Sequence, residues 1–401
     1  MILSERQKNF LPWMKDKFLS DRIVKLIGYA GTGKTTIMQE LCKDHGKAMW
    51  CCPTHEAKNI LQGKLGQEDL VTTVASALGM GPVFNKITGK SGFSQKYPNK
   101  INRVSPDLLV VDESSMLDKK TAKAIFSSSA KKILFVGDSA QIPPVSTDIS
   151  YIYSDDCNEI EEYELTEIFR QAYDSNICLV AESVRSGLSG FEAAQKHSVP
   201  VLTFSHGSVT KFYDRYPDGM SLCFTHKYKD ICNRIALNGN ECDYFTNGAI
   251  IFLESPVKPP DGPTNGSRVK ITSDIVEQNI FGYNVFSFEI EEKYRINVPA
   301  TDSERKKIMK GKASLANKYI VCKDKTMQDA IKKDIERMDA IFTMASPGYA
   351  MTIHKSQGST FNDILVVIKD IAPFKNSGIF KRMLYTAITR AANNLIFACG
   401  G

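Results

Sequence analysis

The stretch GYAGTGKT at residues 28–35 decides the fold. It matches the pattern G-x-x-x-x-G-K-[ST], and it stands between the apolar run IVKLI at residues 23–27 and a helical pattern at residues 35–45. Glycines let backbone N–H groups turn toward a phosphate, a lysine reaches the outer phosphates, and a hydroxyl group binds Mg²⁺. The candidates for these contacts are Gly28, Gly31, Gly33, Lys34, Thr35 and Thr36. The alternative is a simple glycine turn, but the flanking strand and helix favour a phosphate-binding loop.

Outward from this loop, short β-branched runs alternate with helical patterns along the chain. The runs are IVKLI, AMWCC, DLLVVD and KKILFVGD before residue 140, and SLCFT, GAIIFLE, DILVVI and NLIFA after residue 220. Such alternation indicates parallel sheets covered by helices on both faces. At about 150 residues per domain, a chain of 401 residues holds two to three units. We therefore expect an α/β protein with two main domains.

Two segments interrupt the alternation and are predicted to be insertions. The segment at 80–105 is rich in glycine, lysine and aromatic residues, which indicates a hairpin inserted in the first domain. The segment at 254–340 begins with turn residues and continues with strand-like alternation, which indicates a small β-rich domain. Its lysine-rich part at 303–339 is expected to form a helical, solvated face. The predicted domains are therefore 1–155, then 156–253 with 341–401, and the insertion at 254–340.

An acidic pair follows one of the predicted strands, in LLVVDESS at residues 108–115. Hydrolysis of metal-bound ATP needs one carboxylate to hold Mg²⁺ and a second group to orient and deprotonate water. Asp112 suits the first role and Glu113 the second. A solvated strand end is the alternative, which the preceding phosphate-binding loop makes less attractive.

Three further polar residues complete a candidate ATPase site. Gln141 follows the strand that ends in VGD, where the end of a neighbouring parallel strand would meet the nucleotide and sense its γ-phosphate. A polar turn closed by Pro143 and Pro144 is the alternative. Arg170 and Arg390 lie far from the loop in sequence, and phosphoryl transfer uses an arginine supplied across a cleft. Each of them could equally be a surface ion-pair residue.

Composition restricts the class of protein only loosely. The net charge of +6 permits a polyanionic partner without requiring one. Apolar runs reach about five residues, far below the ~20 needed to span a bilayer, and no signal peptide is apparent, so we expect a cytoplasmic protein. We expect the ten cysteines, including the adjacent Cys51 and Cys52, to be reduced core residues rather than metal ligands.

Seven motifs, taken in their order along the chain, resemble those of the superfamily one helicases. They are GYAGTGKTT, PTHEAK, VVDESSM, GDSAQIPPV, LTEIFRQ, TIHKSQGSTF and LYTAITRA. The set is similar to the RecD-like branch, which includes the phage Dda helicase, and the resemblance runs from Leu3 to Ala398. It implies two RecA-like domains that clamp ATP, with a pin hairpin inserted in the first and an SH3-like β insertion in the second. Single-stranded DNA would run across both domains.

The resemblance also implies roles for individual residues. Gln7 would contact the adenine, and the ATPase site would consist of Lys34, Thr35, Asp112, Glu113, Gln141, Arg170 and Arg390. The DNA strand would meet Thr54 and His55 from the first domain, and His354, Lys355, Ser356 and Gln357 from the second. Phe93 would stack on the last base pair as a wedge, or else pack within its own hairpin. Two positions depart from the family pattern, since Thr360 replaces a glutamate that meets the ribose and Ala75 replaces a histidine.

The function implied is an ATP-dependent DNA helicase that uses ATP and Mg²⁺ and translocates from the 5′ to the 3′ end. Expected partners are single-stranded DNA and duplex junctions, and possible ones are a single-strand-binding protein or other replication and recombination proteins. We expect a monomer with no membrane contact, in the cytoplasm of a bacterium or a phage-infected host. The alternatives are an RNA-directed helicase, a P-loop ATPase without a nucleic-acid substrate, and a binding protein with a relic ATP site.

Overall fold

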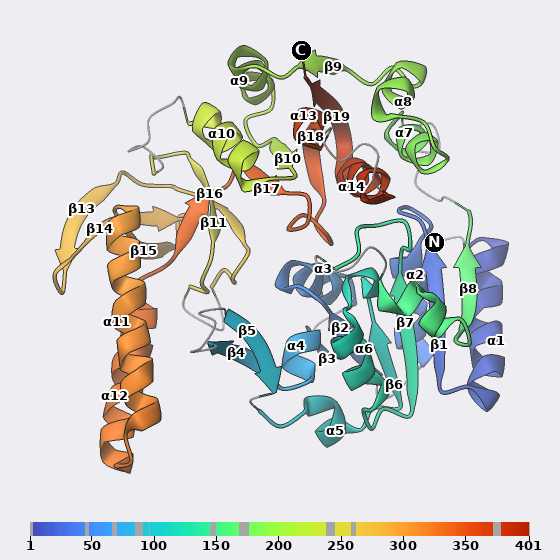
Figure 1. Ribbon diagram of the computed structural model, residues 1–401, viewed down its shortest axis with the longest axis horizontal. Helices are drawn as coiled ribbons and strands as arrows, with labels where there is room; N and C mark the ends of the chain where they lie inside the picture. The colour runs from blue at the N-terminus through green and yellow to red at the C-terminus, as the bar shows by residue number, and fades with distance from the viewer. Residues whose placement is uncertain are drawn as a thin grey trace. The chain divides into compact units, whose positions relative to one another are not determined.

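The computed structural model describes most of the 401-residue chain (Figure 1). For Thr35 and Phe93 it describes the backbone and not the side chain. Contacts divide the chain into two compact units, one of Met1–Phe204, Leu222–Thr225 and Thr352–Gly401, the other of Ser205–Ser221 and His226–Met351. The domain boundaries expected from the sequence stay a prediction. The described residues are 3–44, 48–65, 70–84, 91–95, 97–144, 150–167, 176–237, 245–257, 262–371 and 378–400.

A six-stranded parallel sheet carries the phosphate-binding loop and forms the centre of the first α/β part. Its strand order is β3 (Leu70–Thr73), β2 (Ala48–Cys52), β6 (Leu108–Val111), β7 (Lys132–Gly137), β1 (Ile23–Gly28) and β8 (Glu161–Leu165). Strand β7 lies between β1 and β6, and Ile27 is level with Gly137. The carboxyl ends of β1, β6 and β7 therefore meet at one edge of the sheet, which is where ligands bind in such folds.

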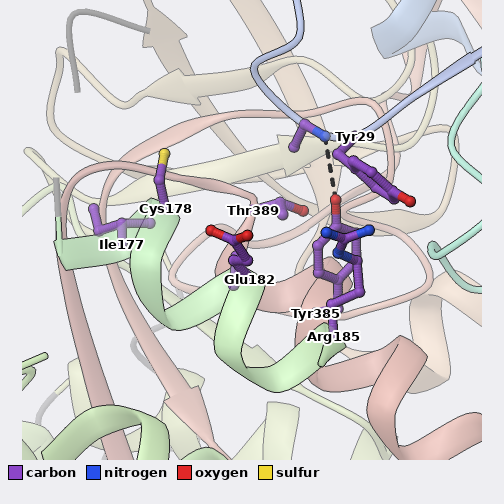
Figure 2. Close-up of a pocket in the computed structure, with 9 residues that line it drawn as sticks. Tyr29, Ile177, Cys178, Glu182, Arg185, Tyr385 and Thr389 are labelled. Carbon is purple, nitrogen blue, oxygen red and sulfur yellow. Dashed lines mark hydrogen bonds between the residues drawn. The ribbon is translucent and has the colours of Figure 1, made fainter. Parts of the chain in front are cut away.

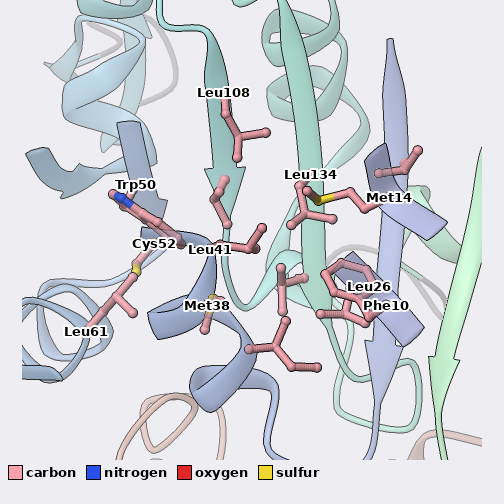
Figure 3. Packing of buried hydrophobic residues seen from close by; sticks show 14 of the residues in the cluster. Phe10, Met14, Leu26, Met38, Leu41, Trp50, Cys52, Leu61, Leu108 and Leu134 are labelled. Carbon is pink, nitrogen blue, oxygen red and sulfur yellow. The ribbon is translucent and has the colours of Figure 1, made fainter. Parts of the chain in front are cut away.

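Apolar cores cover both faces of this sheet. In β6, Leu108 and Val110 belong to one buried cluster, whereas Leu109 and Val111 belong to the other. A strand buried on both faces reads as a continuous apolar run rather than as an alternation. Figure 3 shows the first cluster, to which α1 contributes Phe10 and Met14. Full burial of each large apolar side chain contributes about 1.5–3 kcal/mol, so these cores hold the strand ends in place.

The helices around this sheet begin at recognisable capping residues. Helix α1 (Glu5–Ser20) starts with a capping box in which Ser4 accepts from the N–H of Gln7 and the Gln7 side chain accepts from the N–H of Ser4. The other α-helices here are α2 (Lys34–Asp44), α3 (His55–Leu65), α4 (Val74–Ala77), α5 (Lys100–Val104) and α6 (Lys119–Phe126). Three 3₁₀ turns follow the strands β6 and β7, at η1 (Ser114–Met116), η2 (Tyr151–Tyr153) and η3 (Asp155–Cys157).

A five-stranded sheet forms the centre of the second α/β part. Its order is β17 (Ala350–Thr352), β10 (Met220–Cys223), β18 (Phe361–Val367), β19 (Ala391–Cys399) and β9 (Val201–Thr203). The pairs β18 with β19 and β19 with β9 are parallel. Its helices are α7 (Asn176–Arg185), α8 (Gly190–Lys196), α9 (His206–Arg215), α10 (His226–Ala236), α13 (Ile368–Ile371) and α14 (Gly378–Ile388). The two sheets confirm the predicted α/β class.

The structure agrees in part with the two insertions predicted from the sequence. Strands β4 (Met80–Phe84) and β5 (Ser91–Gln95) form the predicted hairpin, in which Pro82 is opposite Phe93. The second insertion contains an antiparallel meander of β13 (Val276–Ile280), β14 (Tyr283–Ile290) and β15 (Tyr294–Pro299). A second antiparallel sheet joins β11 (Ile250–Leu253) with β12 (Arg268–Lys270) and β16 (Ala345–Pro347).

Helices fill the rest of that insertion. Helices α11 (Asp302–Val321) and α12 (Lys325–Ile341) confirm that the lysine-rich stretch is helical and largely exposed. Each of these helices buries only a few apolar residues, such as Ile308 in α11 and Ile331 in α12, as a helix with one narrow apolar face does. The SH3-like arrangement stays a prediction.

Two other expectations concern burial. Cys51 and Cys52 lie buried in β2, as expected of core residues, and burial raises the pKa of Cys51 to about 12. That thiol stays protonated at neutral pH. None of the helices in the described ranges is both long enough and apolar enough to cross a membrane.

Candidate functional site

A cleft of about 1200 Å³ lies at the carboxyl edge of the six-stranded sheet. It brings together residues from distant parts of the sequence, all within the first compact unit. Five of the six predicted catalytic residues line it, and Arg170 lies outside the described residues. The polar residues of this cleft that bear on catalysis are Lys34, Thr36, Asp112, Glu113, Gln141 and Arg390.

The phosphate-binding loop needs its glycines for close packing. Gly33 has a φ of +78°, and a Cβ atom there would lie 2.1 Å from Nε2 of Gln7. That Nε2 atom donates to the carbonyl oxygen of Thr32 at 3.1 Å, and Gln7 is only 3% exposed. Gln7 therefore buttresses the loop from α1, and its contact with adenine stays a prediction. Gly31 also has a positive φ of 87°, which favours glycine.

Lys34 lies over this loop at the start of α2. Its ammonium group donates to the carbonyl oxygens of Gly28, at 2.5 Å, and Tyr29, at 3.0 Å. The N-terminus of α2 presents backbone N–H groups and a partial positive charge to the same cleft. Loop, lysine and helix end therefore form the kind of site that binds a phosphate chain.

The acidic pair follows β6 directly. The N–H of Asp112 donates to Cys51 in the neighbouring strand at 2.8 Å, and its Oδ1 atom accepts from the N–H of Glu113 at 2.9 Å. Burial, and then the adjacent charge of Glu113, raise the pKa of Asp112. A positive charge placed in the cleft would favour the ionised form of this carboxylate.

Glu113 combines two features that are typical of functional residues. Its φ of +51° lies in the left-handed region, which costs a residue other than glycine about 1–3 kcal/mol. Its buried Oε2 atom has no hydrogen-bond partner among the described residues. A buried acceptor without a partner is costly unless water or a ligand completes it. This carboxylate is thus placed to accept a proton from a molecule in the cleft.

Gln141 presents a second incomplete acceptor to the cleft. It is 3% exposed, and in the described structure its Oε1 atom has no hydrogen-bond partner. The turn that carries it is ordered by Asp138, which accepts from the N–H groups of Ala140 at 2.9 Å and Gln141 at 3.2 Å. The side chain is therefore held in a defined place at the end of β7.

Arg390 enters the cleft from the turn between α14 and β19. Its guanidinium group donates to three neutral oxygen atoms, on Thr386 at 3.2 Å, Ser359 at 3.2 Å and Thr389 at 3.1 Å. The side chain is almost fully buried, so its charge is poorly solvated. An anion in the cleft would offer this charge a counterion.

Two of the predicted DNA contacts, Thr54 and His55, lie at the start of α3 in the first α/β part. The Thr54 hydroxyl accepts from the N–H of Ala57 at 3.1 Å and so caps the helix, while His55 is exposed. Beside Thr54 in the sequence, Pro53 lines a groove of about 1380 Å³ with Ala75, Met80, Met116, Lys120 and Pro144. This groove is mostly apolar, and its charged residues are one lysine and one aspartate, Asp118.

The predicted DNA contacts in the HKSQG segment differ from one another in exposure and in hydrogen bonding. Lys355 is exposed, whereas His354 is half-buried beside the ring of Phe224, and burial lowers its pKa. Ser356 is fully buried and donates to the carbonyl oxygen of Ile353 at 2.8 Å. Gln357 donates to the carbonyl oxygen of Ile142 at 2.8 Å, which ties this segment to the loop of Gln141. Roles of these residues in DNA binding stay predictions.

The sequence reasoning missed the role of α14 in holding the site together. Arg382, Tyr385 and Thr386 share one face of this helix, and each bonds a residue between 138 and 142. The signal was present in RMLYT at residues 382–386, because polar residues spaced by three and four positions on a buried helix need partners. A second missed signal is Thr225–His226 after β10, which repeats the order of Thr54–His55 after β2.

Comparison with known proteins shows which families this chain is similar to. Residues 3–199 match the family described as an AAA domain, and residues 347–398 match the UvrD-like helicase C-terminal domain. The RecD subunit of the RecBCD enzyme from Buchnera aphidicola of Schizaphis graminum is 27% identical over 94% of this chain and 70% of that protein. The ATP-dependent RecD2 DNA helicase of Deinococcus radiodurans is 29% identical over 46% of this chain and 24% of that protein.

Solved structures support the fold. The Bacteroides Pif1 bound to single-stranded DNA has a TM-score of 0.59 at 17% identity and covers 99% of this chain and 92% of that one. The Pif1 helicase of Candida albicans has a TM-score of 0.56 at 17% identity, with coverage of 99% and 94%. At this identity the likeness concerns the fold alone. The two family matches, the RecD and RecD2 relatives and the order of the motifs together support a superfamily one helicase of the RecD-like branch.

Proposed function

We propose that this chain, an ATP-dependent DNA helicase, moves along single-stranded DNA in the 5′ to 3′ direction and separates the duplex ahead of it. The observation that carries the ATPase part is a pair of buried oxygen atoms, on Glu113 and Gln141, that have no hydrogen-bond partner within the described ranges. Both residues line one cleft with Lys34. Two incomplete acceptors in a phosphate-binding cleft suit a water molecule held for attack on a γ-phosphate.

Mg²⁺ is proposed as the second cofactor beside ATP. Asp112, at the end of β6, and the hydroxyl of Thr35 would hold it, because Mg²⁺ prefers hard oxygen ligands and keeps several of its waters. The carboxylate of Asp112 lines the cleft with Lys34 and fits this role. When bound, the ion would neutralise charge on the phosphate oxygens.

Each residue of the proposed ATPase site has a separate role in hydrolysis. Lys34 and the N–H groups of the loop hold the phosphate chain, Glu113 accepts the proton of the attacking water, and Gln141 orients that water. Arg390, with Arg170, stabilises the charge that develops on the transferred phosphoryl group. Gln7 supports the loop and would contact the adenine.

DNA is proposed to meet the chain through charged and apolar surfaces. Exposed His55 and Lys355, with Thr54, His354, Ser356 and Gln357, form the predicted strand contacts, and the groove beside Pro53 would accept unstacked bases. Such contacts tolerate many sequences, and binding should weaken as salt rises. Further proposals are a monomeric state, cytoplasmic location and contact with a single-strand-binding or replication protein.

The direction of movement is expected from the RecD-like branch and is open to direct test. Forked or tailed duplexes that carry a 5′ single-stranded tail should be unwound in the presence of ATP, whereas those with only a 3′ tail should not. Gel separation of labelled strands measures this, with a blunt duplex and a non-hydrolysable ATP analogue as controls. Unwinding that requires a 3′ tail would contradict the proposed direction.

Phe93 is proposed as the wedge at the duplex junction. It lies in β5 opposite Pro82, in a hairpin that belongs to the first α/β part. Stacking of a base on an aromatic ring is worth about 1–3 kcal/mol, so Phe93→Ala should slow unwinding about tenfold while DNA-stimulated hydrolysis stays near the wild-type rate. Phe191→Ala, which removes an exposed ring from α8, is the matched control. Equal losses of unwinding and hydrolysis would remove the support for a wedge.

A further inference from the structure

The hydroxyl of Tyr385 joins two of the cleft's loops to α14. It donates to Oδ2 of Asp138 at 2.9 Å and accepts from the backbone N–H of Ala30 at 3.2 Å. Figure 2 shows the bond to the loop backbone, beside the stacked side chains of Tyr29 and Arg185, whose ring centroid and Cζ atom are 3.6 Å apart. One buried phenol thus contacts the phosphate-binding loop and the turn after β7 at once.

The same face of α14 holds the rest of that turn. Arg382 donates to the carbonyl oxygen of Ser139 and, at 3.3 Å, to that of Gln141. The hydroxyl of Thr386 accepts from the N–H of Ile142 at 3.1 Å. Because all these partners lie between residues 138 and 142, the position of α14 determines where the turn presents the side chain of Gln141.

Hydrogen bonds at the end of α14 connect Tyr385 with Arg390. The carbonyl oxygen of Tyr385 accepts from the N–H of Thr389 at 3.0 Å. The next carbonyl, on Thr386, accepts from the hydroxyl of Thr389 at 2.9 Å and from Nε of Arg390 at 3.2 Å. Arg390 is therefore held to the end of α14, and the hydrogen bonds of the Tyr385 hydroxyl hold this end of the helix against the phosphate-binding loop.

We propose that Tyr385 is a positioning residue for ATP hydrolysis, which acts by setting the register of α14 so that Arg390 and Gln141 meet the same γ-phosphate. The proposal rests on the proposed ATPase function. Tyr385 is not itself expected to touch the nucleotide, because both hydrogen bonds of its hydroxyl are made within the protein. Burial, and then the charge of Asp138, raise the pKa of Tyr385, so the phenol remains a donor across the range of ordinary assays.

The variant Tyr385→Phe removes both hydrogen bonds and keeps the ring. We expect kcat for DNA-stimulated ATP hydrolysis to fall about tenfold, while the affinity for a fluorescent ADP analogue stays within about twofold, since hydrogen bonds to charged groups are worth more than neutral ones. Tyr213→Phe is the matched control, because its hydroxyl also bonds two groups, Ser221 at 2.6 Å and the Tyr349 carbonyl at 2.8 Å, in the other compact unit. An unchanged kcat in Tyr385→Phe would overturn the proposal.

A double-mutant cycle separates positioning from a general loss of stability. If Tyr385 acts through Arg390, Tyr385→Phe should lower kcat by less than about twofold in an Arg390→Ala background, because coupled residues are not additive. Fully multiplicative losses would overturn the proposal. If Tyr385→Phe does not fold, Asp138→Asn weakens the same bond and must itself lower kcat and show the same coupling. A wild-type chain without ATPase activity would instead defeat the proposed function, which distinguishes the two failures.

Discussion

Glu113→Gln is expected to lower kcat for ATP hydrolysis by about 10²–10⁴-fold, the range associated with loss of a general base. The amide has the same shape as the carboxylate but cannot accept the proton of the attacking water. The Oε2 atom of Glu113 is buried and has no hydrogen-bond partner among the described residues, so no exposed carboxylate is expected to replace it. Steady-state release of phosphate in the presence of single-stranded DNA measures the effect.

ATP binding should survive this change. The backbone N–H of Glu113, which bonds Asp112, is retained, and the side chain is not expected to hold the phosphates. Affinity for ATP, measured with a fluorescent analogue, should therefore stay within a few-fold of wild type. Glu159→Gln, an exposed glutamate in the turn before β8, is the matched control. A rate for Glu113→Gln within about threefold of wild type would exclude Glu113 as the base.

Lys34→Ala is expected to lower kcat/KM for ATP by about 10²–10³-fold or more, as for loss of one preorganised group that stabilises charge in the transition state. The ammonium group is held at the loop by the carbonyl oxygens of Gly28 and Tyr29, so it would meet the phosphates without rearrangement of the backbone. Here the affinity for ATP should fall as well, in contrast to Glu113→Gln.

The control for this variant is Lys8→Ala, which removes an exposed lysine from α1. Thermal unfolding of both variants should stay close to that of wild type, because neither lysine belongs to an apolar core. Wild-type activity in Lys34→Ala would show that hydrolysis takes place at another site or comes from a contaminant.

Local patterns in the sequence predicted most of the parallel sheets. Strand β6 is buried on both faces, so LLVV reads as a strand without any knowledge of its neighbours. The phosphate-binding loop, Asp112 and Glu113 were predicted from spacing alone, since all of them directly follow strands. Their meeting in one cleft follows from the common edge of parallel strands.

Those local patterns could not predict which residues far apart in the sequence bond to each other. The bond between Tyr385 and Asp138 joins residues 247 positions apart, and no local period encodes it. Likewise, the resemblance implied DNA contacts for Ser356 and Gln357, which stay predictions, but it did not imply that both side chains are buried and bonded within the protein. The helices α11 and α12 were expected, but the insertion was assigned as β-rich because its first half alternates strongly.

The most direct test of the central claim is steady-state ATP hydrolysis by the intact chain with Mg²⁺, measured alone, with single-stranded DNA and with single-stranded RNA. Each measurement is paired with Lys34→Ala. A DNA-driven motor predicts strong stimulation by single-stranded DNA, weaker stimulation by RNA, and loss of both in the variant. Equal rates with and without either polymer would contradict the claim and favour a P-loop ATPase that has no nucleic-acid substrate.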